Sequence, residues 1–222
     1  MARFDALVRR AGSYSAREIM ADRTIHTIGL LAAVAAIAVL MTLVARQHDL
    51  DRLLTICVYA AGLAAMLGCS AAYNLARASP RKETLRRFDH AAIFVMIAGT
   101  YTPFSVDAIG GARGWVLLSA VWVMAMGGVA MKLLLPLRFE VLSVALYLLI
   151  GWVGLVALEP LVAALPLSSF ALLAGGGVLY TVGVAFYAIA ALPFHKAIWH
   201  GMVLAAAACH YGAVLSGIVL VS

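Results

Sequence analysis

The stretch RFDHAAIFVMIAGTYTPF at residues 87–104 decides the fold, because it places a carboxylate at the start of an otherwise apolar run. An ionisable group at membrane depth is costly unless another group pairs with it. Asp89 therefore needs a partner. Two other stretches offer candidates, SAAYN at residues 70–74 and HKAIWH at residues 195–200. We expect the three stretches to meet in the folded protein.

The composition excludes a soluble globular protein. Hydrophobic residues make up 65% of the chain, charged residues only 12%, and the mean hydropathy is +1.02. So little polar surface cannot cover a water-soluble fold, and a helix needs about 20 apolar residues to cross a bilayer. The sequence predicts an all-α, polytopic membrane protein, a bundle of seven transmembrane helices. The expected spans are 25–45, 53–76, 88–106, 115–135, 139–158, 169–191 and 197–221.

The short connections between these spans predict one compact domain. We expect a basic, cytoplasmic N-terminal segment at residues 1–24, followed by a seven-helix transmembrane domain at residues 25–222. The first apolar run is too long for the core of a cleavable signal peptide, so we interpret it as a retained span.

The distribution of positive charge predicts the orientation in the membrane. If the N-terminus is cytoplasmic, all of the 16 Lys and Arg residues except Arg46, Arg52 and Arg113 lie on the inner side. Because cytoplasmic loops carry the excess of Lys and Arg, we expect a multi-pass protein of the cell inner membrane with a periplasmic C-terminus. This bias accounts for the net charge of +6. Membrane lipids are the expected partners, nucleic acid is not, and the sequence names no protein partner.

The same topology brings the unusual polar residues to one depth. Ser70 and Asn74 lie near the inner end of the second span, Asp89 at the inner start of the third, and Lys196 and His200 at the inner start of the seventh. Residues four apart share a helix face. The sequence therefore predicts one polar site near the cytoplasmic face.

Three other histidines have separate interpretations. His195 lies five residues before His200, about 140° around a helix, so it points elsewhere unless Pro193 leaves the first turn irregular. For His26 and His210, a hydrogen bond between helices is favoured over metal binding.

Several motifs together resemble the hemolysin III family, relatives of the progestin and adipoQ (adiponectin) receptors. They are DHAAI and AGTYTPF at residues 89–93 and 98–104, TIG at 27–29, GWVG at 151–154, GGGVLY at 175–180 and AIWH at 197–200. The resemblance extends from about residue 20 to the end of the chain and implies a seven-helix bundle.

The resemblance also implies a zinc site. The family's ligands are one histidine four residues after the second-span serine and two histidines, four apart, that open the seventh span. The serine and aspartate, here Ser70 and Asp89, hold the zinc-bound water. Zinc lowers the pKa of that water and polarises a carbonyl, chemistry that suits hydrolysis of a lipid amide such as ceramide.

This chain departs from the family pattern at two of the three ligand positions. Asn74 and Lys196 stand where the family has histidine, and His200 is retained. One hypothesis is a metal-free site in which the Lys196 ammonium replaces the ion opposite Asp89 and Asn74 bridges the two. A second is a zinc site rebuilt with His195 and His200, and a third is a chance cluster of solvated groups.

Three functional classes remain open. The chain is a degenerate, metal-free relative of zinc-dependent lipid-amide hydrolases that acts in membrane lipid homeostasis, or an active ceramidase-like zinc enzyme, or a pore-forming hemolysin. The last is suggested by the family name alone, since the spans carry no repeated ring of polar residues.

Overall fold

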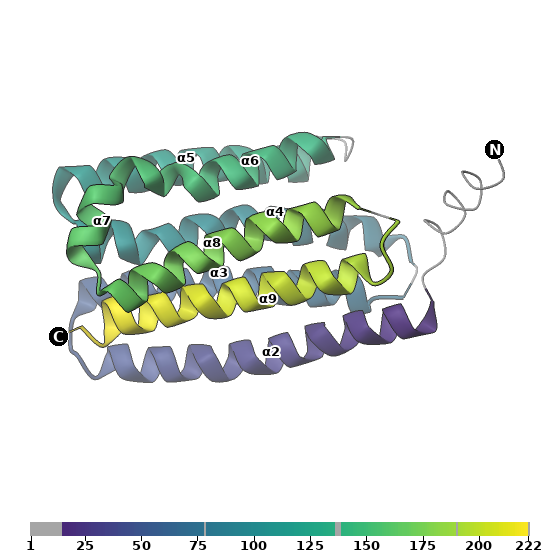
Figure 1. Cartoon of the computed structure of the whole chain (residues 1–222), viewed down its shortest axis with the longest axis horizontal. Coiled ribbons are helices and arrows are strands. Elements are labelled where there is room, and N and C mark those ends of the chain that lie inside the picture. Colours follow the sequence, from purple (N-terminus) through teal and green to yellow (C-terminus); the bar gives the residue numbers. More distant parts are fainter. Residues whose placement is uncertain (1–14, 78, 136–138, 190, 222) are drawn as a thin grey trace.

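The computed structural model describes residues 15–77, 79–135, 139–189 and 191–221. These residues contain no strand and form seven helical spans long and apolar enough to cross a membrane (Figure 1). The predicted fold class is confirmed. The spans are α2 (Ala16–Ala45), α3 (Leu50–Leu75), α4 with η1 (Arg81–Pro103, Phe104–Ile109), α5 (Gly111–Leu134), α6 with η2 and α7 (Glu140–Trp152, Val153–Ala157, Leu158–Ala164), α8 (Leu167–Ala188), and α9 with η3 (His195–Val214, Leu215–Val219).

Helix α2 begins well before the predicted start of the first span at Ile25. Ser15 caps it: the Ser15 hydroxyl accepts from the Glu18 backbone N–H, and the Glu18 carboxylate accepts from the Ser15 N–H. This reciprocal pair satisfies two backbone donors at the helix start. The helix therefore extends through the charged residues before the apolar run and carries Asp22 on a helical turn. Residues 1–14 of the predicted N-terminal segment lie outside the described residues.

The fifth span is interrupted rather than continuous. Helix α6 ends at Trp152, the short 3-10 helix η2 follows, and α7 continues to Ala164. The Tyr101 hydroxyl holds this break, since it donates to the Gly151 carbonyl at 2.9 Å and accepts from the Gly154 N–H at 2.6 Å. Irregular backbone at membrane depth requires such partners, because lipid offers none.

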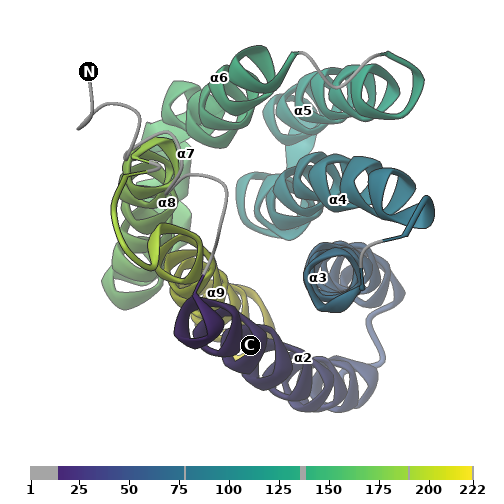
Figure 2. The ribbon, with the colours of Figure 1, turned by 90° about the vertical axis from the view of Figure 1, so that its right-hand side faces the viewer.

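The helices surround a central region when the bundle is viewed along its length (Figure 2). Helix α2 packs on α3 and α9, α4 packs on α3 and α5, and α8 packs on α9. Because successive spans are antiparallel, α2, α4, α6 and α9 all start at one end of the bundle. We call this the basic end. Its described Lys and Arg residues are Arg17, Arg23, Arg77, Arg81, Lys82, Arg86, Arg87, Lys132 and Lys196.

Two glycines of α5 offer a matched test of this packing. A Cβ at Gly114 would fall on the Ser105 carbonyl oxygen, whereas a Cβ at Gly127 meets nothing within 4 Å. Backbone cannot move aside as a side-chain tip can, so Gly114→Ala is expected to lower the free energy of unfolding by about 2 kcal/mol. Gly127→Ala is expected to be neutral or stabilising by up to about 1 kcal/mol. Thermal unfolding in detergent measures both, and equal shifts would contradict the α5–η1 contact.

Candidate functional site

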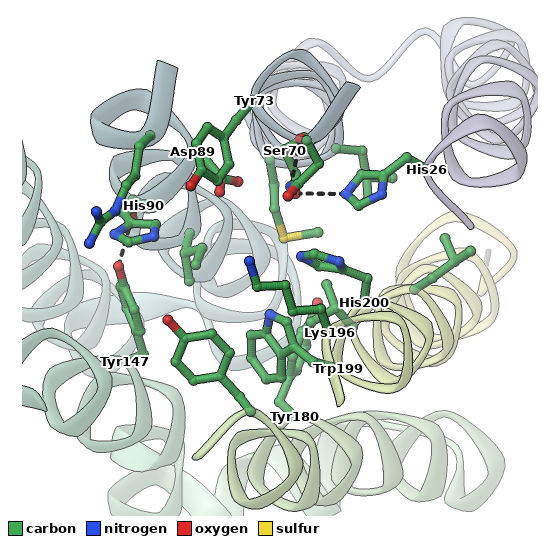
Figure 3. A pocket seen from close by; sticks show the side chains of 18 of the residues that line it. His26, Ser70, Tyr73, Asp89, His90, Tyr147, Tyr180, Lys196, Trp199 and His200 are labelled. Carbon is green, nitrogen blue, oxygen red and sulfur yellow. Dashed lines mark hydrogen bonds between the residues drawn. The ribbon is translucent and has the colours of Figure 1, made fainter. Parts of the chain in front are cut away.

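A cavity of about 320 Å³ opens among the helices at the basic end. Five residues singled out from the sequence line it together: Ser70, Asn74, Asp89, Lys196 and His200. Figure 3 shows side chains from α3, α4 and α9 directed into this space. Segments separated by more than a hundred residues therefore contribute to one polar chamber.

His195 lies elsewhere. Its side chain is buried beside the start of α9, with Nδ1 3.2 Å from the Leu192 carbonyl oxygen, and it is not among the residues that line the cavity. His200, five residues further along α9, faces the cavity. The two histidines thus point in different directions, as residues five apart on a regular helix do.

A carboxylate and two imidazoles converge at the cavity wall. Asp22, His26 and His200 each offer one ligand atom, and the three atoms lie within 4.8 Å of one another. The His200 Nδ1 atom is 2.5 Å from Asp22 Oδ1, and the His26 and His200 ring centroids are 4.4 Å apart. Asp22 and His26 are four apart on α2, and His200 comes from α9. The chain thus has a group of residues able to hold a metal ion.

The chemistry of this group fits zinc, unlike that of the positions implied by the family pattern. Asn74 offers an amide and Lys196 an ammonium, and neither is a useful zinc ligand. Two imidazole nitrogens and one carboxylate oxygen, by contrast, are the donor set of several catalytic zinc sites, which keep the fourth position open. Asp22, His26 and His200 are therefore the residues that would hold such an ion.

Hydrogen bonds fix the orientation of His26. Its Nδ1–H donates to the Asp22 carbonyl oxygen at 2.8 Å, so Nε2 carries the lone pair and accepts from the Ser70 hydroxyl at 3.2 Å. The Asn74 amide in turn donates to the Ser70 carbonyl at 2.9 Å. The hydrogen bond between helices expected for His26 is present, and His210 forms another, from its Nε2 to the Leu173 carbonyl at 3.2 Å.

Asp22 is the site residue that sequence reasoning missed. The apolar run predicts a first span at residues 25–45, so Asp22 falls in the predicted basic N-terminal segment at residues 1–24. The signal was available in DRTIH at residues 22–26, where a carboxylate precedes a histidine by four positions and so shares its helix face.

A second, more apolar cavity of about 190 Å³ extends the first toward the middle of the bundle. The two share several lining residues, among them Met66, Tyr147, Tyr180 and Trp199. Leu, Ile, Val, Met, Phe and Trp side chains form most of the wall of the second cavity. A polar chamber at the basic end is thus adjacent to a space suited to hydrocarbon.

Comparison with known proteins agrees with the resemblance inferred from the motifs. The family model described as "Haemolysin-III related" matches residues 17–211. The chain is 35% identical over 202 residues to "Hemolysin-3 homolog" of Bacillus subtilis (strain 168). The aligned region covers 91% of this chain and 95% of that protein. It is 33% identical over 199 residues to "Hemolysin-3" of Bacillus cereus, and that alignment covers 90% of this chain and 91% of that protein.

A more distant relative comes from animals. The chain is 28% identical over 173 residues to human "Monocyte to macrophage differentiation factor", with 72% of this chain and 69% of that protein covered. The family model and the two bacterial relatives span nearly the whole of the seven-helix bundle. The chain therefore belongs to the haemolysin III-related family and is a multi-pass membrane protein with seven helical spans.

Proposed function

We propose that the cavity at the basic end is the active site of a zinc-dependent hydrolase that cleaves the amide bond of a membrane lipid. One observation carries this proposal: the ligand atoms of Asp22, His26 and His200 lie within 4.8 Å of one another. The two histidines line the same cavity as Ser70 and Asp89. A donor set without nearby proton-transfer groups would support metal storage only. Here a hydroxyl and a second carboxylate face the same space.

The reaction is the addition of water to an amide carbonyl. A zinc ion, when bound, supplies a Lewis acid and a water of lowered pKa. The Asp89 carboxylate accepts the proton that the attacking water loses. The carbon–nitrogen bond then breaks, the proton passes to the departing nitrogen, and the products are a carboxylic acid and an amine. The Ser70 hydroxyl accepts from the Asn74 amide and donates to His26 Nε2, and it would give up the second bond when that nitrogen binds an ion.

The apolar cavity supports a lipid as the substrate. It adjoins the polar chamber at Tyr147, Tyr180 and Trp199, so a molecule with its amide in the chamber has room for hydrocarbon toward the bundle interior. Burial of each methylene group there is worth about 0.8 kcal/mol. A ceramide-like lipid amide, the substrate class that the family resemblance implies, has this division into polar and apolar parts.

A metal-free function is the second candidate, and the contact between Asp22 and His200 favours it. Asp22 Oδ1 and His200 Nδ1 are 2.5 Å apart, so the two side chains form a hydrogen bond with each other without an ion. Lys196 also lies near enough to attract the Asp22 carboxylate. On this alternative the bundle keeps the scaffold of a lipid-amide hydrolase without its reaction and acts in membrane lipid homeostasis.

The location of the protein is part of the same proposal. Among the described residues, Arg46, Arg52 and Arg113 are the Lys and Arg residues at the end opposite the basic end. The positive-inside rule supports a cytoplasmic basic end and N-terminus, and a periplasmic C-terminus, in a cell inner membrane. Membrane lipids are the proposed partners.

The proposal predicts amide hydrolysis that depends on zinc. Purified protein in liposomes that contain a ceramide-like lipid with a fluorescent acyl chain is expected to release the fluorescent fatty acid. Chelation should slow this release by more than about 100-fold, and added zinc should restore it. Zinc-loaded protein that leaves the amide intact would contradict the hydrolase. Ion flux through the same liposomes would instead support the pore-forming alternative.

A further inference from the structure

The wall of the polar cavity opposite the metal-ligand group carries a second set of ionisable side chains. Arg86 and His90 come from α4, Lys132 from α5 and Glu140 from α6, and all four line the cavity. Figure 3 shows His90 on the far side of the chamber from His26 and His200. None of these four residues belongs to the metal-ligand group.

This set carries more positive than negative charge. The Arg86 guanidinium forms an ion pair with the carboxylate of Glu140, the one acidic residue among the four. Lys132 is only 3% exposed, and within the part of the chain that the structure describes it forms no ion pair with a carboxylate. A buried ammonium without a counter-charge is costly. The cluster therefore has one uncompensated positive charge directed at an open space.

The positive groups also repel one another. Lys132 lies near enough to Arg86 for the two like charges to interact unfavourably. An anion placed between them converts this repulsion into attraction, and the His90 imidazole can donate a hydrogen bond to the same anion. The arrangement is unfavourable without a ligand and favourable with one, as expected for a binding site rather than for a structural ion-pair network.

The backbone around the cluster is firmly held. The Arg87 guanidinium donates to the Leu133 carbonyl oxygen at 3.0 Å, which fixes the start of α4 against the end of α5. The Tyr147 hydroxyl donates to the His90 carbonyl oxygen at 2.8 Å, which ties α6 to α4 (Figure 3). The basic side chains thus project from two helices, α4 and α5, and contacts other than those of the cluster set the positions of these helices and of α6.

The depth of the cluster identifies the ligand chemistry. Lys132 is in the last turn of α5 and Arg86 lies near the start of α4, so both sit at the end of the bundle, where lipid headgroups meet the protein. Basic pockets between transmembrane helices at this depth bind the phosphate groups of lipids. Lys is a common phosphate ligand as a point charge, and Arg offers paired donors. We propose that Arg86, His90 and Lys132 form an anion subsite for a phosphate group, supplied by a lipid headgroup or as free phosphate.

The subsite does not depend on the proposed hydrolase. It uses neither a metal ion nor Asp22, His26 or His200, so loss of zinc leaves it intact and loss of phosphate binding leaves zinc content unchanged. If both are correct, the chamber holds a phosphate on the α4–α5 side and a metal ion on the α2–α9 side.

Binding of two lipids that differ only in the phosphate tests the subsite. The full chain is placed in phosphatidylcholine nanodiscs with either phosphatidic acid or diacylglycerol, and native mass spectrometry counts the lipids retained. The wild-type protein is expected to retain phosphatidic acid at least about tenfold more tightly than diacylglycerol. Lys132→Gln should remove about tenfold of this affinity, and Lys132→Arg should keep most of it.

Arg113→Gln is the matched control, because it removes a positive charge from the opposite end of the same helix. It should leave the affinity for phosphatidic acid unchanged. A parallel titration with inorganic phosphate distinguishes the two sources: binding of inorganic phosphate that requires Lys132, with no preference for phosphatidic acid, assigns the subsite to free phosphate. Equal losses in Lys132→Gln and Arg113→Gln, or no Lys132-dependent binding of either probe, would overturn the proposal.

A second measurement covers the case in which Lys132→Gln does not fold. Phosphatidic acid or inorganic phosphate that binds the folded wild-type protein must raise its thermal midpoint, and diacylglycerol must not. If neither phosphate compound raises the midpoint, the subsite is absent whatever the variant does.

Discussion

His200→Ala is expected to abolish zinc binding and lipid-amide hydrolysis together. His200 is the member of the metal-ligand group supplied by α9. Its Nδ1 atom lies 2.5 Å from Asp22 Oδ1, and its ring centroid lies 4.4 Å from that of His26. Loss of a group that merely supports a ligand already lowers metal affinity or activity by about 10-fold to 100-fold, so loss of a ligand should exceed that range. Zinc content by mass spectrometry and fatty-acid release from the fluorescent lipid amide measure both effects.

His195→Ala is the control for this variant. It removes an imidazole from the same helix, but His195 lies beside the Leu192 carbonyl rather than in the cavity wall. We expect zinc content to stay at the wild-type level. If His195→Ala loses zinc and Asp22→Ala keeps it, the ligands are His195 and His200, and the group identified here is wrong.

Asp89→Asn is expected to lower kcat by about 10²-fold to 10⁴-fold while zinc content stays unchanged. The Asp89 side chain lines the cavity beside Ser70 but is not one of the three ligand residues. An amide keeps the size of the carboxylate and cannot accept the proton from water. A separation of activity from metal content is therefore the signature of a proton-transfer role.

Asp107→Asn is the matched control for Asp89. Asp107 belongs to the same span but lies at the opposite end, where its carboxylate accepts from the Thr55 hydroxyl at 2.6 Å. We expect wild-type kcat from this variant. Zinc loss in Asp89→Asn would place Asp89 among the ligands, and unchanged kcat would remove it from the reaction.

Composition and the lengths of the apolar runs predict the seven spans, and the topology inferred from the positive charges predicts that Ser70, Asp89 and His200 lie at one depth. Both rest on strong, long-range constraints: the width of the bilayer and the cost of an unpaired charge within it. The start of α2 was missed because a hydropathy window detects only the apolar part of a helix. The capping residues Ser15 and Glu18, which set its true start, are polar.

Local hydrogen-bond choices were harder to predict. The metal-free hypothesis gives Asn74 a role between Lys196 and Asp89, and the structure adds a bond that the hypothesis lacks: the Asn74 amide donates to the Ser70 carbonyl one turn earlier on its own helix. A partner four residues away is present wherever the helix forms, whereas one on another helix depends on packing that the sequence does not display. The break in the fifth span likewise depends on Tyr101, which comes from another span.

The most direct test of the zinc site is the zinc stoichiometry of the purified, chelator-washed wild-type protein. It is compared with that of a variant in which Asp22, His26 and His200 are all replaced by alanine. The zinc site proposed here predicts about one zinc ion per chain in the wild-type protein and none in the triple variant. The same zinc content in both, at any level, would contradict it. If zinc instead appears only when Asn74 and Lys196 are both replaced by histidine, the chain is a metal-free relative of zinc-binding members of its family.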